Sequence, residues 1–278
     1  MMKINNDIKN LIKQALKEDI GKGDVTTNAL IPPKQQAKAV IVAKQSGVIA
    51  GLDIVRAVFT QLDKNINVRI LVKDGDKVSA NQKIIEIKGK ARAILTAERT
   101  ALNFMSHLSG IATLTRQFVD KANPYNAKIL DTRKTMPGMR LLEKCAVKCG
   151  GGVNHRIGLW DGVLVKDNHI AVLGGEFSSI IIKKASKNMP IEIEVKNLNE
   201  LKEALKAKVD TILLDNMSIS QIKKSVAIRG KARVLLEVSG GVNLANVRQI
   251  AKAGPDRISI GALTHSAKAL NLSLIING

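Results

Sequence analysis

The sequence predicts an α/β protein, in which a small α+β domain precedes a parallel β/α barrel, either complete or incomplete. Two observations support this prediction. After Pro124, short apolar segments alternate with helical ones, and the last four recur about every twenty residues, the spacing of a β/α unit. Between Ala37 and Gly89, the apolar segments are closer together and separated by turns. A doubly wound sheet is the alternative, because the repeat alone does not separate it from a barrel.

The first hundred residues contain helical and β-like patterns in turn. Residues 7–17 carry apolar side chains at the spacing of an amphipathic helix. The acid- and glycine-rich segment that follows contains Asp19 and Asp24, which could be metal ligands or cap residues; we favour caps. A second helix is expected over residues 54–62, among the strand-like segments AKAVIVAK, VRILVK and KIIEIKG.

A long helical pattern follows these β-like segments and extends over residues 91–121. Gly110 lies within it and predicts a break before a second helix. We therefore expect residues 1–110 to form the N-terminal domain and residues 111–267 the barrel. The last segment, 268–278, is expected to join the N-terminal domain.

The net charge of +20 could reflect an anionic partner, such as nucleic acid, a membrane surface or a small substrate, or it could be lysine drift without a function. The excess is mostly lysine spread along the chain, and only 2% of residues are aromatic, so a nucleic-acid partner is not favoured. No apolar run is long enough to span a bilayer, and we expect a cytoplasmic protein without a membrane partner. Cys145 and Cys149 lack a second pair for zinc and are expected to be structural thiols.

Polar residues stand where the predicted barrel strands end, and the active site of a β/α barrel forms at that edge. In the segment IEIEVK, alternation would turn Glu192, Glu194 and Lys196 toward the barrel interior. Buried carboxylates require pairing or a metal, so Glu194 could form a salt bridge with Lys196 or Lys166 while serving a function. The strand-end residues form a polar ring: Asp131, Lys166, Glu194, Asp215, Ser239, Gly240, Gly241 and Gly261.

The segment 131–170 is the best candidate for an anion pocket. Its cations interrupt apolar runs and glycines, which favours a pocket over a solvated basic face. Lys166 could instead have a lowered pKa and form a Schiff base, but the surrounding cations favour charge recognition. His155 could donate a hydrogen bond to a carboxylate, whereas His107, His169 and His265 could equally be cap or packing residues. The cationic residues are Arg133, Lys134, Arg140, Lys144, His155, Arg156, Lys166 and His169.

Two predicted strands are each followed by glycine and then by a predicted helix, in the segments VSGGVN and ISIGALTH. Backbone N–H groups of such turns bind anions, and barrels often hold a phosphate at their last two βα loops. Two such turns at adjacent final strands predict a site for a sugar phosphate.

The motifs ERTALNF, SGIAT, DTRKT, PGMR, GGGVNHR, LVKDNHI, LLDN, SGG and IGALTH occur together and in this order. In these motifs the chain, from about Glu18 to its end, resembles the quinolinate phosphoribosyltransferases, also called carboxylating nicotinate-nucleotide pyrophosphorylases. The resemblance implies a type II phosphoribosyltransferase fold, with an N-terminal α/β sandwich and a β/α barrel, as a homodimer or a hexamer of dimers. It also implies conversion of quinolinate and phosphoribosyl pyrophosphate to nicotinate mononucleotide, pyrophosphate and CO2 with Mg²⁺, in de novo NAD synthesis.

Family roles carry over onto matching positions of this sequence. The quinolinate carboxylates would meet Arg133, His155, Arg156 and Lys166, with Arg99 donated across the dimer interface. The resemblance also implies a catalytic set of Lys134, Lys166, Glu194 and Asp215, in which the two lysines meet the pyrophosphate and the two acids hold the ribose and, directly or through water, Mg²⁺. The remaining substrate-binding positions are Thr135 and the phosphate cradle of Ser239, Gly240, Gly241, Gly261, Ala262 and Leu263.

Departures from the family pattern are few. Met136 follows DTRKT, and Lys196 stands where a third acid is common, which leaves the charge balance around Glu194 open. The alternative functions are those of a relative attached to molybdate transport, a nicotinate phosphoribosyltransferase and a basic nucleic-acid-binding module. An arginine-rich pocket favours a dicarboxylate over nicotinate, because a second cation without a partner is costly to bury.

Overall fold

A computed structural model describes residues 4–172, 189–207 and 209–277. The chain forms two compact units. Unit 1 comprises residues 1–114, 137–151 and 267–278, and unit 2 comprises residues 115–136 and 152–266. The division falls close to residue 110 and assigns the C-terminal segment to unit 1, whereas residues 137–151 group with unit 1 although the sequence suggested the barrel.

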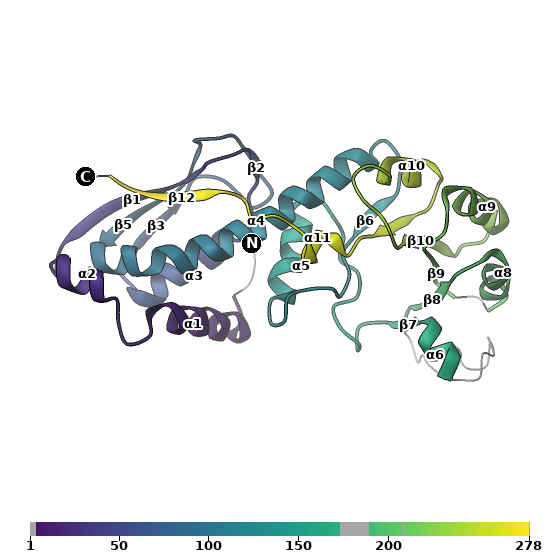
Figure 1. Ribbon diagram of the computed structural model, residues 1–278, viewed down its shortest axis with the longest axis horizontal. Helices are drawn as coiled ribbons and strands as arrows, with labels where there is room; N and C mark the ends of the chain where they lie inside the picture. The colour runs from purple at the N-terminus through teal and green to yellow at the C-terminus, as the bar shows by residue number, and fades with distance from the viewer. Residues whose placement is uncertain (1–3, 173–188, 208, 278) are drawn as a thin grey trace. The chain divides into compact units, whose positions relative to one another are not determined.

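Unit 1 contains a four-stranded antiparallel sheet in the order β12-β1-β5-β3. The C-terminal strand pairs with β1 along its length, as in the register Ala39 to Ile276 (Figure 1). A separate pair is formed by β2 (Gly47–Val48) and β4 (Lys77–Val78). The strands of the larger sheet are β1 (Gln36–Ala43), β3 (Asn67–Ile70), β5 (Lys83–Lys90) and β12 (Leu272–Asn277).

The helices of unit 1 follow the sequence pattern. Asn5 caps the first helix, and Asp24 caps the second by accepting the N–H of Thr27 at 2.9 Å, as predicted for a cap. Asp19 is not a cap: it lies in the last turn of the first helix and accepts the hydroxyl of Thr100. The helices are α1 (Asn6–Ile20), α2 (Val25–Leu30), α3 (Leu52–Leu62) and α5 (Arg140–Cys149).

The long helix α4 (Ala91–Ala122) continues through Gly110, so the predicted break is wrong. A Cβ at position 110 would overlap the backbone carbonyl oxygen of Lys268. Glycine is therefore required by the close approach of the C-terminal segment, and the helix tolerates its weak propensity.

Unit 2 contains six parallel strands in the order β6-β11-β10-β9-β8-β7. From β7 to β11, consecutive strands are neighbours and their order never reverses, which identifies a singly wound barrel and excludes the doubly wound alternative. In the described chain no named strand joins β6 to β7, so the barrel is incomplete. The strands are β6 (Lys128–Leu130), β7 (Val163–Val165), β8 (Ile191–Val195), β9 (Thr211–Asp215), β10 (Leu235–Ser239) and β11 (Arg257–Ser259).

Helices follow these strands in unit 2 (Figure 1). Ser218 and Gln221 form a reciprocal capping box at the start of α9, and Asn197 caps α8. No helix within the described ranges is long and apolar enough to cross a membrane. The helices are α6 (Asp167–Val172), α8 (Leu198–Lys206), α9 (Ile219–Arg229), α10 (Val247–Lys252) and α11 (Ala262–His265).

Candidate functional site

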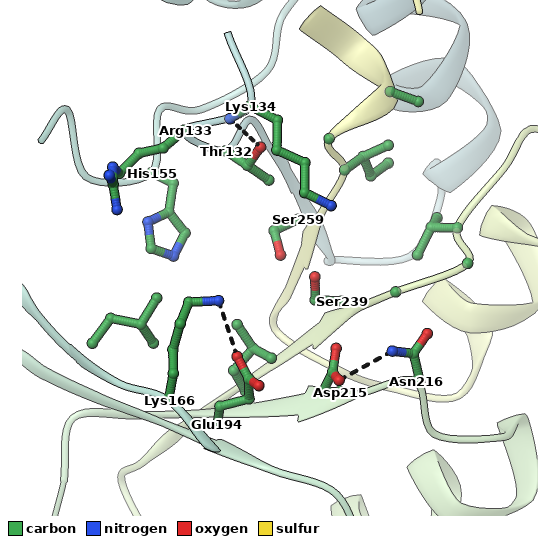
Figure 2. A pocket seen from close by; sticks show the side chains of 18 of the residues that line it. Thr132, Arg133, Lys134, His155, Lys166, Glu194, Asp215, Asn216, Ser239 and Ser259 are labelled. Carbon is green, nitrogen blue, oxygen red and sulfur yellow. Dashed lines mark hydrogen bonds and ion pairs between the residues drawn. The ribbon is translucent and has the colours of Figure 1, made fainter. Parts of the chain in front are cut away.

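A cavity of about 730 Å³ opens where the strands of the barrel end, and unit 2 alone forms it. Twelve residues expected at the site line this cavity, which confirms that the strand ends converge (Figure 2). They are Arg133, Lys134, His155, Arg156, Lys166, Glu194, Asp215, Ser239, Gly240, Gly241, Gly261 and Ala262.

Lys166 and Glu194 form an ion pair inside this cavity. The Lys166 Nζ lies 3.2 Å from Oε2 of Glu194, a carboxylate that is almost fully buried on β8 (Figure 2). The partner of Glu194 is thus Lys166, one of the two expected from the sequence. The expectation that Lys196 faces the interior is wrong: β8 ends at Val195, and the exposed Lys196 contacts Asp167 at 2.7 Å.

Asp215 ends β9 and is held by the residue that follows it. The side-chain amide of Asn216 donates to Oδ2 of Asp215 at 3.0 Å, and the Asn216 N–H donates to the carbonyl of Ser239 at 2.9 Å (Figure 2). Asn216 has a φ of 53°, an uncommon conformation that asparagine tolerates better than most residues. Asn216 belongs to the motif LLDN, but the sequence pattern predicted no role for it.

A hydrogen bond joins the DTRKT segment (residues 131–135) to the turn and helix that follow β11. The hydroxyl of Thr264 donates to the Lys134 carbonyl at 2.7 Å, and the Lys134 N–H donates to the hydroxyl of Thr132 at 3.1 Å. The Lys134 side chain lies against Gly261, where a Cβ would approach it within 2.8 Å. These contacts direct a lysine toward the position predicted for a phosphate.

Arg133 and Arg156 form the other end of the cavity. Burial and the neighbouring positive charge of Arg133 lower the pKa of Arg156. The buried Nε of Arg133 has no hydrogen-bond partner among the described residues, and Arg156 donates from Nη1 to the carbonyl of Gly162 at 3.0 Å. Two guanidinium groups held near each other favour a ligand with more than one negative charge.

His155 lies between this end and the barrel interior. Its Nε2 is 2.9 Å from Oε2 of Glu192 and 3.3 Å from Oε1 of Glu237. Burial opposes the charged ring, but the hydrogen bonds to the two glutamates outweigh it and raise the pKa of His155 to about 9. The sequence alternation placed Glu192 inside the barrel, but Glu237 was missed although the same alternation in RVLLEVS would have found it.

The glycine turns supply backbone donors rather than side chains. Gly240 and Gly241 have positive φ values of 90° and 62°, and Gly261 precedes α11. Successive N–H groups in such turns form concave sites for anions. Ser239 and Ser259 both line the cavity, and Ser259 was not among the strand-end residues that the sequence predicted (Figure 2).

Some residues of the sequence prediction do not line the cavity. Thr135 donates its N–H to the Arg133 carbonyl, and Leu263 is fully buried. Arg99 is an exposed residue of α4 in unit 1, and its role across an interface stays a prediction. Arg140 and Lys144 also belong to unit 1, while His169 accepts the N–H of Lys166 at 2.9 Å in the first turn of α6.

Together, the barrel and its cavity define a class of protein: a β/α-barrel enzyme whose cavity has the charges to suit phosphorylated and carboxylated substrates. Cations, two carboxylates and glycine turns meet at the edge where barrels carry their active sites.

Comparison with known proteins specifies the family. Residues 24–109 match the N-terminal domain of quinolinate phosphoribosyl transferase, and residues 111–275 match its C-terminal domain. The chain therefore belongs to the quinolinate phosphoribosyltransferase family.

Individual relatives agree with this assignment over nearly the whole chain. The chain is 41% identical to quinolinate phosphoribosyltransferase [decarboxylating] 2b of Nicotiana tabacum, over 98% of this chain and 82% of that protein. It is 42% identical to a probable nicotinate-nucleotide pyrophosphorylase [carboxylating] of Methanocaldococcus jannaschii, over 96% of each. The nicotinate-nucleotide pyrophosphorylase structure from Francisella tularensis matches with a TM-score of 0.92 and 44% identity, over 99% of this chain and 98% of that one.

Proposed function

We propose that this protein transfers a phosphoribosyl group from phosphoribosyl pyrophosphate to quinolinate and yields nicotinate mononucleotide, pyrophosphate and CO2, a step of de novo NAD synthesis. One observation carries the proposal. A single cavity holds four cations for carboxylate and diphosphate groups and two carboxylates for a ribose: Arg133, Lys134, Arg156, Lys166, Glu194 and Asp215.

The arginine end of the cavity suits a dicarboxylate. Arg133 and Arg156 each offer a planar fork of donors that matches a carboxylate, and they lie close enough for Arg133 to lower the pKa of Arg156. A pyridine with one carboxylate would leave one guanidinium without an anion. Quinolinate compensates both charges, which supports it over nicotinate.

The opposite end of the cavity suits the phosphoribosyl donor. Lys134 and Lys166 would meet the diphosphate, and the turns at Gly240 and Gly261 would hold the 5′-phosphate with backbone N–H groups. Glu194 and Asp215 would accept the ribose hydroxyls. The ribose would then lie between the phosphate cradle and the arginine end.

The proposed chemistry requires charge complementarity and positioning. The pyridine nitrogen attacks the anomeric carbon as pyrophosphate departs, and the positive charge that develops on the ribose is stabilised by Glu194 and Asp215. Lys134 and Lys166 stabilise the departing diphosphate. Ribosylation makes the ring a pyridinium, and its cationic nitrogen stabilises the electron pair that stays on the neighbouring ring carbon when the carboxylate there departs as CO2. A proton from solvent then adds to that carbon and completes nicotinate mononucleotide.

The acidic residues also fit the proposed Mg²⁺. Asp215 is partly exposed at the cavity and Glu194 keeps Oε1 outside its ion pair with Lys166. Mg²⁺ is commonly bound by one or two carboxylates together with water and substrate phosphates, so two acids beside a diphosphate site are an adequate donor set. The bound ion would neutralise charge on the leaving diphosphate.

We further propose a homodimer in which Arg99 reaches the partner's quinolinate site. Arg99 is exposed on α4 and does not line the cavity of its own unit 2. Mixing an inactive Arg99→Ala protein with an inactive Lys166→Ala protein should restore part of the activity, because one of the two sites in a mixed dimer would be intact. No restoration despite demonstrated subunit exchange would contradict the shared site.

Calorimetric titration tests the substrate assignment. Quinolinate should bind at least about tenfold more tightly than nicotinate, a difference of about 1.4 kcal/mol. Phthalate, which has both carboxylates but no ring nitrogen, should bind competitively with quinolinate without being turned over. Equal affinity for quinolinate and nicotinate would contradict the dicarboxylate assignment.

A further inference from the structure

The segment 153–156 lies at the open edge of the incomplete barrel. Val153 forms an isolated parallel bridge with Leu130 of β6. At its other end, Arg156 donates to the carbonyl of Gly162, directly before β7. Because β6 and β7 are the two edge strands of the sheet, this short segment contacts both sides of the opening and carries Arg156 of the arginine end of the cavity.

Two buried acids from opposite sides of the barrel hold this segment. Asp131, which is fully buried after β6, accepts the N–H of His155 at 2.9 Å and the side-chain amide of Asn154 at 2.5 Å. Glu192 of β8 is 8% exposed and contacts Nε2 of His155 at 2.9 Å. One acid therefore fixes the backbone of His155 and the other fixes its ring.

The ring of His155 in turn holds the backbone of Arg156 through a hydrogen bond. The backbone N–H of Arg156 donates to Nδ1 of His155 at 2.8 Å, which requires a lone pair on Nδ1. The two carboxylates favour a proton on Nε2 and, by stabilising positive charge, raise the pKa of the ring. The Arg156 N–H that points at Nδ1 opposes a second proton there, and this contact favours the neutral ring in spite of the raised pKa. The ring protonated on Nε2 alone satisfies all these contacts.

The proton on Nε2 of His155 is incompatible with a metal ion bound by His155, Glu192 and Glu237. His155, Glu192 and Glu237 offer ligand atoms within 4.8 Å of one another, as a metal site would. Coordination through Nε2 needs its lone pair and would move the proton to Nδ1, where it would displace the N–H of Arg156. The hydrogen bonds therefore favour a proton between His155 and Glu192.

We propose that Glu192 is a positioning residue for the dicarboxylate subsite: it fixes the ring of His155, which in turn holds the backbone of Arg156. This inference rests on the proposed function, because Arg156 is assigned to quinolinate there. Glu192 does not line the cavity and touches no proposed substrate group, so its effect must pass through His155. Small displacements of a charge-recognition group are sufficient to weaken binding strongly.

Three substitutions of Glu192 separate this role from general stability. In Glu192→Gln, the amide oxygen still accepts the Nε2 proton, so the KM for quinolinate should stay within about threefold of the native value. Glu192→Met keeps the length but removes the acceptor, and Glu192→Asp shortens its reach. Both should raise the KM for quinolinate by about tenfold or more, with the KM for phosphoribosyl pyrophosphate changed less than about twofold.

A matched control removes buried volume elsewhere in unit 2. Ile222→Ala, on α9, deletes a fully buried side chain away from the cavity and should lower stability while leaving both KM values near native. If Glu192→Met does not fold, the comparison of Glu192→Gln with Glu192→Asp tests the same point. If the native enzyme does not bind quinolinate, the proposed function is wrong. If the native enzyme does bind quinolinate, the KM values of the variants test the role of Glu192.

Three results would overturn the role of Glu192. An unchanged KM for quinolinate in folded Glu192→Met and Glu192→Asp proteins would show that His155 needs no acceptor at this position to hold Arg156. An equal rise in the KM values of both substrates would show that Glu192 serves the barrel as a whole. A Glu192→Gln protein as impaired as Glu192→Met would show that a hydrogen-bond acceptor for the ring is not what Glu192 supplies.

Discussion

The side-chain amide of Asn216 occupies the space where any side chain at position 240 would begin. A Cβ added to Gly240 would overlap both the oxygen and the nitrogen of this amide, and Gly240 has a φ of 90°. The same amide donates to Asp215, and the Asn216 N–H donates to Ser239. The absence of a side chain at Gly240 therefore allows Asn216 to orient a carboxylate of the proposed ribose site.

Substitution of Gly240 tests this relationship. Gly240→Ala should displace Asn216, disturb Asp215 and raise the KM for phosphoribosyl pyrophosphate by about tenfold or more, with a smaller effect on quinolinate. Gly230→Ala is the matched control, because Gly230 also has a positive φ but ends α9 away from the cavity, where a Cβ would meet its nearest atom, the carbonyl oxygen of Ala227, at 3.8 Å. That control should show only backbone strain, of order 1 kcal/mol. Equal kinetic effects of both substitutions would refute the steric explanation.

Arg133 and Arg156 should discriminate between the two substrates. Arg133→Ala or Arg156→Ala should weaken quinolinate binding by about 2 kcal/mol or more, because each removes a charged donor to a carboxylate. Binding of phosphoribosyl pyrophosphate should change much less. Titrations of both ligands into each variant provide the measurement, and equal losses for both ligands would overturn the assignment.

The cysteines should be unreactive in the folded protein. Burial, with contributions from Asp74 and Cys145, raises the pKa of Cys149 to about 12, and burial also raises the pKa of Cys145. A raised thiol pKa lowers the fraction of reactive thiolate at every pH below it. Iodoacetamide at pH 8 should therefore label both residues slowly in the native chain and quickly in urea. Rapid labelling of the native protein would contradict the raised pKa values of these partly buried thiols.

The sequence predicted the candidate site well because parallel strands bring their ends together, a rule that needs no long-range detail. The predictions for Gly110 and Lys196 were wrong, for two different reasons. Gly110 looked like a helix break, but the helix continues through it. A glycine is needed there because the carbonyl oxygen of Lys268 approaches too closely for a side chain. Alternation turned Lys196 inward, but alternation applies only within a strand, and β8 has ended by that residue.

Contacts between side chains far apart in the sequence were also beyond prediction. Local patterns carried no signal for the ring of His155 lying between Glu192 and the Arg156 N–H. Asn216 stood beside a predicted site residue, but its importance depends on the turn at Gly240, which comes from the next strand. The residue types of the site could thus be predicted, whereas the groups that orient them required the fold.

The most direct test of the proposed reaction follows both products at once. The protein would be incubated with quinolinate labelled in the carboxylate next to the ring nitrogen, phosphoribosyl pyrophosphate and Mg²⁺, and both released CO2 and nicotinate mononucleotide would be measured. We expect equal amounts of the two products, formed only in the presence of Mg²⁺ and lost in Lys166→Ala. Folded protein that forms neither product would contradict the assignment of quinolinate as the substrate.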